Sequence, residues 1–495
     1  MTISLLLEMA SSADPEQIAV VCDDVRMTTG QLSELADGAA GIIASSGAQH
    51  VAYVGTGGVL QPLLIFASAR AAVPYTPINY RLSAEGIHEL IARLPDPLVI
   101  VDKQYRAMVG DAFKRVMDAD EFVAAARDAD PVSEFADPDA VAIVLFTSGT
   151  TSRPKAVELT HANLTSYITG TVEFGSAEPG DAALICVPPY HIAGVNAALS
   201  NLYAGRKMVY LPVFDAKEWV RLVATERVTT ATVVPTMLDR IVAVLEDQPT
   251  ALPSLQNLAY GGSKVPLPLV RKALAMLPDV GFVNAYGLTE TSSTIAVLTP
   301  DDHQTAYRAD DPEVSKRLGS VGKPVPGIEV EVRDEGGNVV DPGQQGELYV
   351  RGEQVSGRYT GIGSVLDEQG WFPTKDLAIL DAEGYLFIIG RSDDTIIRGG
   401  ENIAPAEVED VLVEHPDVHQ VAVVGVEDPQ WGQAIVAVVV PQHGRTPDPE
   451  QLREYVRKTL RGSRTPDRVV FRDSLPATPT GKILRRSIIS DLTEE

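Results

Sequence analysis

The sequence predicts an α/β fold with a large N-terminal domain of parallel-rich α/β subdomains, a small β-barrel-like subdomain and a small α+β C-terminal domain. Three observations support this prediction. Apolar runs of strand length alternate with amphipathic helical stretches through the first three fifths of the chain. The pattern changes near Gly319 to short period-2 segments, and a compact mixture of helical and strand-like stretches follows Arg391.

The strand-length runs of the N-terminal part lie at residues 50–55, 97–102, 140–149, 182–190, 207–213, 230–235, 257–262 and 281–287. Amphipathic helical patterns separate them, for example at residues 28–47 and 215–228. Because strands that alternate with helices are joined by crossover connections, we expect these strands to be largely parallel.

The later segments have a different character. Residues 319–352 and 384–394 contain short period-2 stretches separated by Gly, Pro and Asp, which predicts a small antiparallel unit. The joint to the C-terminal domain is expected within residues 390–402. That domain is predicted to contain helices at residues 405–418 and 448–460 and strands at residues 418–426 and 434–442.

Composition excludes several classes of protein. With 495 residues, 45% hydrophobic and 22% charged, the chain is typical of a globular protein of two or three domains. It contains no apolar run of about 18 residues or more, so no membrane span is expected. The apolar patch at the N-terminus lacks a basic flank and is interrupted by Glu8, so we interpret it as mature protein.

The net charge of −26 argues against nucleic acid or an anionic membrane as a partner. Cys22 and Cys186 lie in apolar runs, which favours buried thiols in a reducing cytoplasm over a disulfide or metal pair. Basic residues outnumber acidic ones between Gln451 and Arg486. That segment is either a solvated helix face or a surface that meets a polyphosphate.

The stretch LFTSGTTSRPKAVELTH, residues 145–161, is a candidate phosphate-binding loop. It lacks the G-x-x-x-x-G-K-[ST] pattern of a nucleotide P-loop, because Pro154 stands where that pattern needs its second glycine. Instead, an apolar strand runs into a row of hydroxyl side chains that ends at Lys155. Hydroxyls and a lysine at the carboxyl end of a strand can bind phosphate, although a polar surface loop is the alternative.

Residues 147–156 resemble the T-S-G-T-T-G-x-P-K-G loop of the adenylate-forming enzymes, the superfamily of acyl-CoA synthetases, peptide-synthetase adenylation domains and luciferases. Further motifs of that family follow in order: NAYGLTE at 284–290, GWFPTKDLA at 370–378, GRSDDTIIRGGENIAPAEVE at 390–409 and PATPTGKILRR at 476–486. PYTPINYRL at 74–82 also resembles the family, so the likeness covers nearly the whole chain.

The resemblance implies a role for each matching residue. The ATP phosphate loop would contain Thr147, Ser148, Gly149, Thr150, Thr151 and Lys155. Magnesium would be held by Thr147 and Glu290, and the catalytic residues would be Lys482, Thr289 and Glu290. Adenine and ribose would contact Gly261, Gly262, Ser263, Tyr286, Gly287, Asp376 and Arg391. The acyl pocket would be lined by His191, Gly194, Val195 and Tyr260.

The family also implies a mobile C-terminal domain. Residues 1–390 would form the adenylation domain and residues 391–393 a hinge that includes Asp393, while residues 394–495 would rotate between two half-reactions. In the first, Lys482 faces the active site, and acid and ATP give acyl-AMP and pyrophosphate. In the second, Gly399, Gly400 and Glu401 line a tunnel for the thiol of coenzyme A, whose phosphates the basic C-terminal surface could hold.

Several positions depart from the family pattern. Ser152 and Ala156 replace glycines of the phosphate loop, and Lys375 replaces the glycine of T-G-D. Arg398 and Ala404 stand where small and aromatic residues are common. None of these changes removes a catalytic side chain, so the resemblance predicts an active enzyme.

A stand-alone acyl-CoA synthetase is the leading interpretation. Residues 188–200 contain no acidic side chain to pair with an α-ammonium group, and their apolar composition suggests a fatty or other apolar acid. No insertion near the joint and no carrier module after Glu495 are seen. The expected ligands are the acid, ATP, Mg²⁺ and coenzyme A. An acyl-AMP ligase serving a separate carrier protein is the alternative, a homodimer is left open, and a non-enzymatic sensor is disfavoured.

Overall fold

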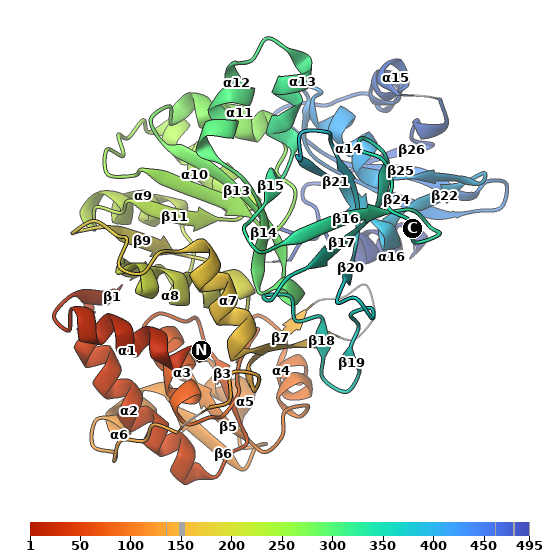
Figure 1. Ribbon diagram of the computed structural model, residues 1–495. Helices are drawn as coiled ribbons and strands as arrows, with labels where there is room; N and C mark the ends of the chain where they lie inside the picture. Colours follow the sequence, from red (N-terminus) through yellow and green to blue (C-terminus); the bar gives the residue numbers. More distant parts are fainter. Residues whose placement is uncertain (135, 148–153, 461, 479–480, 495) are drawn as a thin grey trace.

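The computed structural model describes all residues except 135, 148–153, 461, 479–480 and 495. Two large sheets form its N-terminal part (Figure 1). The first has the order β15 (Lys323–Pro324), β14 (Ser293–Leu298), β13 (Gly281–Leu288), β12 (Asn257–Gly261), β11 (Thr230–Val233), β9 (Ala182–Ile185), β10 (Lys207–Tyr210), β1 (Ile18–Cys22) and β2 (Val25–Thr28). Its strands from β13 to β1 are parallel, as predicted.

The second sheet has the order β19 (Gly363–Ser364), β18 (Arg358–Tyr359), β8 (Lys155–Thr160), β7 (Val141–Thr147), β4 (Tyr75–Ile78), β3 (His50–Val54), β5 (Pro97–Val101) and β6 (Arg115–Asp118). Strands β7 to β6 are parallel, whereas β7 and β8 form an antiparallel pair on either side of the phosphate loop. Because β18 and β19 add to β8, a segment near residue 360 lies beside β8.

Helices cover the sheets and build the core. The principal ones are α1 (Ser4–Ala13), α2 (Thr29–Ser46), α3 (Leu60–Arg70), α7 (His161–Thr171), α8 (Ile192–Ala204), α9 (Ala216–Thr225), α10 (Pro235–Asp247), α11 (Leu267–Met276) and α12 (Pro300–Arg308). The predicted helix at 28–47 is α2, which begins with a capping box between Thr28 and Gln31 and ends at Gly47 in the left-handed conformation. Helices α1, α2, α3 and α8 pack on one another around fully buried side chains such as Phe66.

The antiparallel unit is a four-stranded sheet of β16 (Glu329–Arg333), β17 (Gln345–Arg351), β20 (Phe372–Leu380) and β21 (Leu386–Arg391). The C-terminal part follows it (blue in Figure 1). It contains β22 (Ile396–Arg398), β23 (Glu401–Ile403), α14 (Pro405–Val413), β24 (Val418–Asp428), β25 (Gly432–Pro441), α15 (Pro449–Thr459), β26 (Arg468–Phe471) and α16 (Arg485–Glu494). The predicted fold class is confirmed.

Both cysteines are buried free thiols, as the sequence predicted. Burial raises the pKa of Cys22 to about 11 and that of Cys186 to about 12, so both are protonated and unreactive at neutral pH. In the described part of the chain, none of the helices combines the length and apolar character needed to cross a bilayer.

Two fully buried histidines make stability depend on pH. Burial lowers the pKa of His50 and of His161 from 6.5 to about 4, so both are neutral in the folded protein. Their unfolded forms take up protons below pH 6.5, so their contribution is complete above that pH and is lost as the pH falls towards 4. We expect proton uptake by each of these histidines in the unfolded protein to lower the free energy of unfolding by about 2 kcal/mol as the pH falls from 7.5 to 5.

Chemical denaturation at the two pH values measures this loss. His161→Asn is the matched variant, because its amide oxygen can replace the Nδ1 atom that accepts a hydrogen bond from the Ile3 amide at 3.3 Å. The variant should lose less stability on acidification than the parent protein. The same dependence on pH in both proteins would contradict the prediction.

Candidate active site

The centre of the site is a cluster of buried Asp376 with partly buried Tyr286 and Arg391, which come from β20, β13 and β21. The Tyr286 hydroxyl donates to Asp376 Oδ2 at 2.5 Å, and Arg391 Nη1 lies 3.0 Å from Asp376 Oδ1. Arg391 Nη1 also donates to the Thr374 carbonyl at 2.9 Å. The structure therefore brings together three residues predicted to contact adenine and ribose.

Burial dominates the electrostatics of this cluster. Asp376 is only 5% exposed, and desolvation raises the pKa of its carboxyl group above 3.8. Positive charge on Arg391, the Tyr286 hydroxyl and positive charge on Lys482 act in the opposite direction. Burial also raises the pKa of the Tyr286 hydroxyl, which therefore stays a hydrogen-bond donor to the carboxylate. Lys482 contributes to this field although it belongs to the C-terminal part of the chain.

Glu290 lies in a short segment with an unusual backbone. The 3-10 turn η2 (Thr289–Thr291) carries it, and Ser292 and Ser293 follow with positive φ angles of 55° and 116°. Asn196 Nδ2 of α8 donates to the Ser292 carbonyl at 2.5 Å, and Gln354 Nε2 donates to the carbonyls of Thr291 and Thr294 at 2.9 Å. Hydrogen bonds from two other parts of the chain thus hold this strained turn in place.

The segment before β19 contacts Glu290 directly. The amides of Ser356 and Gly357 donate to the Glu290 carbonyl at 2.9 and 3.3 Å, and the Tyr359 hydroxyl donates to Glu290 Oε1 at 2.9 Å. Lys155 Nζ lies 5.2 Å from the centroid of the Tyr359 ring. Sequence reasoning missed Tyr359. The only feature that marks Tyr359 in the sequence is its position between Gly357 and Gly361. The residues that Tyr359 contacts lie far away in the sequence.

The carboxylate and hydroxyl oxygens at and near Glu290 are ligands that suit a hard cation. The Oε2 atom of Glu290 has no hydrogen-bond partner among the described residues. Thr147 is the last residue of β7, which pairs with β8, and β8 contacts η2, the turn that carries Glu290. Mg²⁺ is typically bound by one or two carboxylates together with substrate phosphates, so a single carboxylate and a hydroxyl fit that ion. In the described ranges, no cluster of three or more His, Cys, Asp or Glu side chains offers a separate metal cage.

At two of the predicted site positions only glycine fits, because a neighbouring strand's backbone lies too close for a Cβ atom. A Cβ atom on Gly261 would lie 2.2 Å from the Ala285 carbonyl oxygen, and one on Gly287 would lie 1.7 Å from the Ser293 carbonyl oxygen. Such contacts are impossible for any other residue, so strands β12, β13 and β14 can pair closely here. Gly262 and Ser263 continue the chain from β12 at the same edge of the sheet.

The predicted acyl-pocket residues divide into two groups. His191, Gly194 and Val195 lie together at the start of α8, and burial lowers the pKa of His191 to about 4, so it is neutral at pH 7. Tyr260 is 1% exposed, and its hydroxyl lies 2.7 Å from His303 Nε2 of α12. The Tyr260 hydroxyl is therefore bound in the interior and is not available to a ligand.

Lys375 has a left-handed backbone, with φ of 65°, where the family pattern has glycine. Its carbonyl accepts a hydrogen bond from the Ser392 hydroxyl at 3.2 Å, and its ammonium lies 3.6 Å from Glu347. Because a side chain disfavours this conformation, Lys375→Gly should raise the unfolding free energy by about 1 kcal/mol.

Denaturation curves of Lys375→Gly and Lys375→Ala check this prediction. The alanine variant also loses the weak, half-exposed ion pair with Glu347 but keeps a Cβ atom in the left-handed conformation. It should therefore not be stabilised. Equal stability of the two variants would contradict the backbone explanation.

The C-terminal part contacts the N-terminal part at the loop that carries Lys482. A Cβ atom on Gly481 would lie 3.0 Å from the side chain of Thr236 on α10, so the loop that carries Lys482 touches the N-terminal part. Lys264 Nζ and Asp410 Oδ2 form an ion pair at 2.6 Å between the same two parts. The predicted hinge residue Asp393 lies in η4 (Ser392–Asp394), 4.0 Å from Arg391 Nη2.

The residues predicted to line the coenzyme A tunnel lie on the surface of the C-terminal part. Gly399 and Gly400 form the exposed turn between β22 and β23, and Glu401 is the exposed first residue of β23. The Gly399 amide donates to the Trp431 carbonyl at 2.8 Å, and Glu401 lies 3.1 Å from Arg464. In the basic C-terminal segment, Arg453, Arg457, Arg464 and Arg485 each pair with a carboxylate of the same domain.

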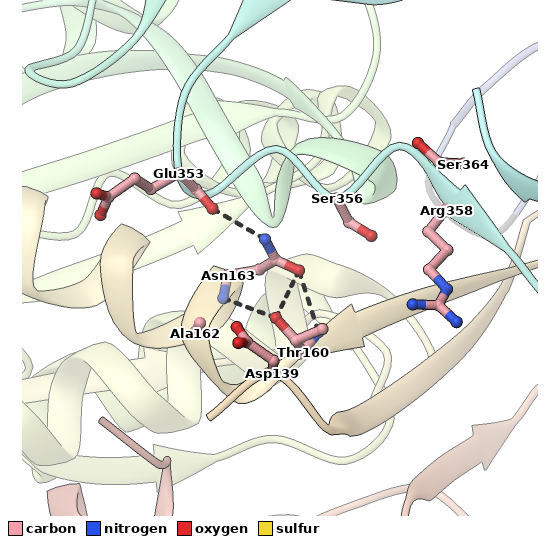
Figure 2. A pocket seen from close by; sticks show the side chains of 8 residues that line it. All are labelled: Asp139, Thr160, Ala162, Asn163, Glu353, Ser356, Arg358 and Ser364. Atoms are coloured by element: carbon pink, nitrogen blue, oxygen red, sulfur yellow. Dashed lines mark hydrogen bonds between the residues drawn. The ribbon is translucent and has the colours of Figure 1, made fainter. Parts of the chain in front are cut away.

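Part of the predicted phosphate loop, namely Ser148, Gly149, Thr150 and Thr151, lies outside the described residues. A hollow of about 610 Å³ lies between the end of β8, the start of α7 and the segment at residues 353–358 whose amides hold Glu290 (Figure 2). Figure 2 shows Asn163 hydrogen-bonded to Thr160 and to the Glu353 carbonyl across this hollow. None of the predicted site residues lines it.

Comparison with known proteins gives consistent matches along the chain. A family model for AMP-binding enzymes matches residues 7–360, and a model for the C-terminal domain of AMP-binding enzymes matches residues 407–482. The chain is 31% identical to indoleacetate–CoA ligase of Aromatoleum aromaticum over 99% of this chain and 98% of that protein. It is 33% identical to feruloyl-CoA synthase of an Amycolatopsis species over 96% of both chains.

It is also 31% identical to a fatty acid–[acyl-carrier-protein] ligase of Streptomyces coeruleorubidus, over 96% of this chain and 93% of that protein. Among solved structures, o-succinylbenzoate CoA synthetase of Bacillus subtilis with its acyl-adenylate intermediate superimposes with a TM-score of 0.85 and 27% identity, covering 98% and 97% of the two chains. The chain therefore belongs to the family of AMP-binding enzymes, the adenylate-forming superfamily that its ordered motifs resemble.

Proposed function

We propose that the protein is an ATP-dependent acid–CoA ligase. In the first step a carboxylate oxygen attacks the α-phosphorus of ATP, so that a P–O bond forms and pyrophosphate leaves. In the second step the thiol of coenzyme A attacks the acyl carbonyl, a C–S bond forms, AMP leaves and the thiol proton passes to solvent. Residues 1–390 would hold ATP and acid, and residues 394–495 would rotate about residues 391–393.

The observation that carries this proposal is the position of Lys482. Its positive charge acts on the buried carboxylate of Asp376, and its loop is packed against Thr236. With the ribose hydroxyls on Asp376, an ammonium group there would neutralise the charge that develops as the carboxylate attacks phosphorus. Mg²⁺ bound by Glu290 and Thr147 would neutralise phosphate charge. A solved structure of o-succinylbenzoate CoA synthetase of Bacillus subtilis in complex with ATP and a magnesium ion supports the choice of this cofactor.

The acid is proposed to be apolar and to lack an α-amino group. The residues at the start of α8, Gly194 and Val195 with the neutral His191, provide no charge for an ammonium group. The sequence suggested a fatty or other apolar acid, and the relatives named for indoleacetate and ferulate favour an aromatic acid within that range. We further propose that the enzyme works in a reducing cytoplasm, since its two thiols are free and buried.

A pyrophosphate-release assay over a panel of aryl, arylacetic and fatty acids, with and without coenzyme A, tests the proposal. We expect no more than one equivalent of pyrophosphate per enzyme without coenzyme A, and repeated turnover with thioester formation when coenzyme A is present. Absence of pyrophosphate release with every acid would contradict the proposal.

The similarity to a carrier-protein ligase favours one alternative, transfer to a phosphopantetheinylated carrier protein. In that case acyl-AMP would persist in the presence of coenzyme A and would be consumed only when the carrier is added. The same assay, with mass spectrometry of the carrier, separates the two acceptors.

A further inference from the structure

Tyr359 lies between two residues that the proposed reaction places on the phosphate side of ATP. Its hydroxyl donates to Glu290 Oε1 at 2.9 Å, and the ammonium group of Lys155 lies 5.2 Å from the centroid of its ring. The residue is only 8% exposed. One buried side chain therefore contacts both a proposed metal ligand and a proposed phosphate ligand, through different parts of the same group.

The backbone around Tyr359 fixes this arrangement. Tyr359 pairs with Val157 of β8, and the Thr360 amide donates to the Ala156 carbonyl at 2.9 Å. Lys155 begins that same strand, so its distance from Tyr359 is set by strand pairing. On the other side, the amide of Ser356 holds the Glu290 carbonyl at 2.9 Å. The segment is thus joined to the neighbours on both sides by main-chain hydrogen bonds.

The hydrogen bond from Tyr359 leaves one oxygen of Glu290 available to a ligand. A carboxylate only accepts hydrogen bonds and a phenol carries its proton at neutral pH, so the Tyr359 hydroxyl is the donor to Glu290 Oε1. With Oε1 occupied, Oε2 is the oxygen of Glu290 that has no hydrogen-bond partner among the described residues. An oxygen fixed in this way is oriented for a ligand, as partners behind a metal-binding carboxylate commonly achieve.

We infer that Tyr359 is a positioning residue for adenylation: its hydroxyl orients the Glu290 carboxylate towards the cation that accompanies ATP, and its ring holds the Lys155 ammonium group towards the phosphates. This inference rests on the proposed function. Tyr359 itself touches neither ATP nor the acid. Its effect is exerted through Glu290 and Lys155.

Two substitutions separate the two halves of this role. Tyr359→Phe keeps the ring under Lys155 but removes the hydroxyl, so it should weaken cation binding and leave metal-free nucleotide binding unchanged. Tyr359→Leu removes both contacts, so it should weaken cation binding and, in addition, the binding of nucleotide without metal. A residue that only fills space would not produce this division.

Tyr385 offers a matched control. Its hydroxyl donates to a carboxylate oxygen of Asp302 at 2.6 Å, and Arg317 and Lys323 lie 4.7 and 4.6 Å from its ring centroid. It thus has the same two kinds of contact as Tyr359, but none of its partners is a predicted site residue. Tyr385→Phe should leave both kinds of ligand binding unchanged.

The experiment is titration of Mn²⁺, followed by electron paramagnetic resonance, into full-length protein saturated with α,β-methylene-ATP. Calorimetry of the same analogue in EDTA measures binding without metal. We expect Tyr359→Phe to raise the dissociation constant of Mn²⁺ about tenfold, with the EDTA value unchanged. Tyr359→Leu should also raise the dissociation constant of the nucleotide in EDTA severalfold.

Each outcome has a defined meaning. Unchanged Mn²⁺ affinity in Tyr359→Phe, with normal binding by the parent protein, would overturn this inference alone. An equal loss in Tyr385→Phe would also overturn it, because the effect would then be a general result of losing a buried hydroxyl. A parent protein that binds no metal–nucleotide would overturn the proposed function and the inference with it.

Discussion

Replacing Lys482 with alanine is expected to abolish formation of acyl-AMP while largely sparing thioester formation from presynthesised acyl-AMP. The positive charge of Lys482 acts on the buried Asp376 carboxylate in the domain orientation seen here, and losing one stabilising contact to developing charge costs about 100- to 1000-fold in rate. Pyrophosphate release and transfer from synthetic acyl-AMP to coenzyme A are measured separately.

Lys217→Ala is the control, since Lys217 is an exposed lysine on α9 and is not a predicted site residue. It should leave both half-reactions at the rate of the parent protein. An equal loss of both half-reactions in Lys482→Ala would contradict the assignment of this lysine to the first step alone.

Asp376→Asn should lower both stability and ATP affinity. The substitution keeps the shape of the side chain but leaves the guanidinium group of Arg391, 3.0 Å away, without its buried counter-charge. Removing one member of a buried pair typically costs about 3 kcal/mol or more of unfolding free energy. Loss of the carboxylate that would accept the ribose hydroxyls should weaken ATP binding about tenfold or more.

Asp102→Asn separates the two effects. Asp102 is a half-buried carboxylate that accepts hydrogen bonds from a tyrosine hydroxyl and an amide, in its case those of Tyr53 and Thr56 at 2.9 Å. It is not a predicted nucleotide ligand, so its variant should lose stability but bind ATP normally by calorimetry. Normal ATP binding by Asp376→Asn would argue against the ribose assignment.

Much of the fold was predictable from the sequence because its information is local. Each strand predicted between residues 50 and 287 is present, since apolar runs between helical stretches can hardly be buried in any other way. The site cluster was predictable through the ordered motifs, and the structure brings Tyr286, Asp376 and Arg391 together within hydrogen-bonding distance.

Features that depend on distant pairing were not predictable. Tyr359 reaches Glu290 only because β18 adds to β8, and neither short strand has a pattern of its own. The hydrogen bond between the Tyr260 hydroxyl and His303 depends on where α12, which carries His303, packs against the sheet. Likewise, the docking of the C-terminal part through Lys264 and Asp410 involves two exposed side chains that no local pattern marks.

The central claim is that the C-terminal domain is docked here for adenylation and must rotate for thioester formation. Cysteines in place of Lys264 and Asp410, which form the 2.6 Å ion pair across the two parts, can be joined by a short bis-maleimide. The native thiols are buried and should not react. Each single-cysteine variant, capped with the same reagent, serves as the control.

The measurement is the rate of each half-reaction after cross-linking. The account predicts that the cross-linked protein forms acyl-AMP at close to the rate of the controls but transfers almost none of it to coenzyme A. Thioester formation at the full rate by the cross-linked protein would contradict the account.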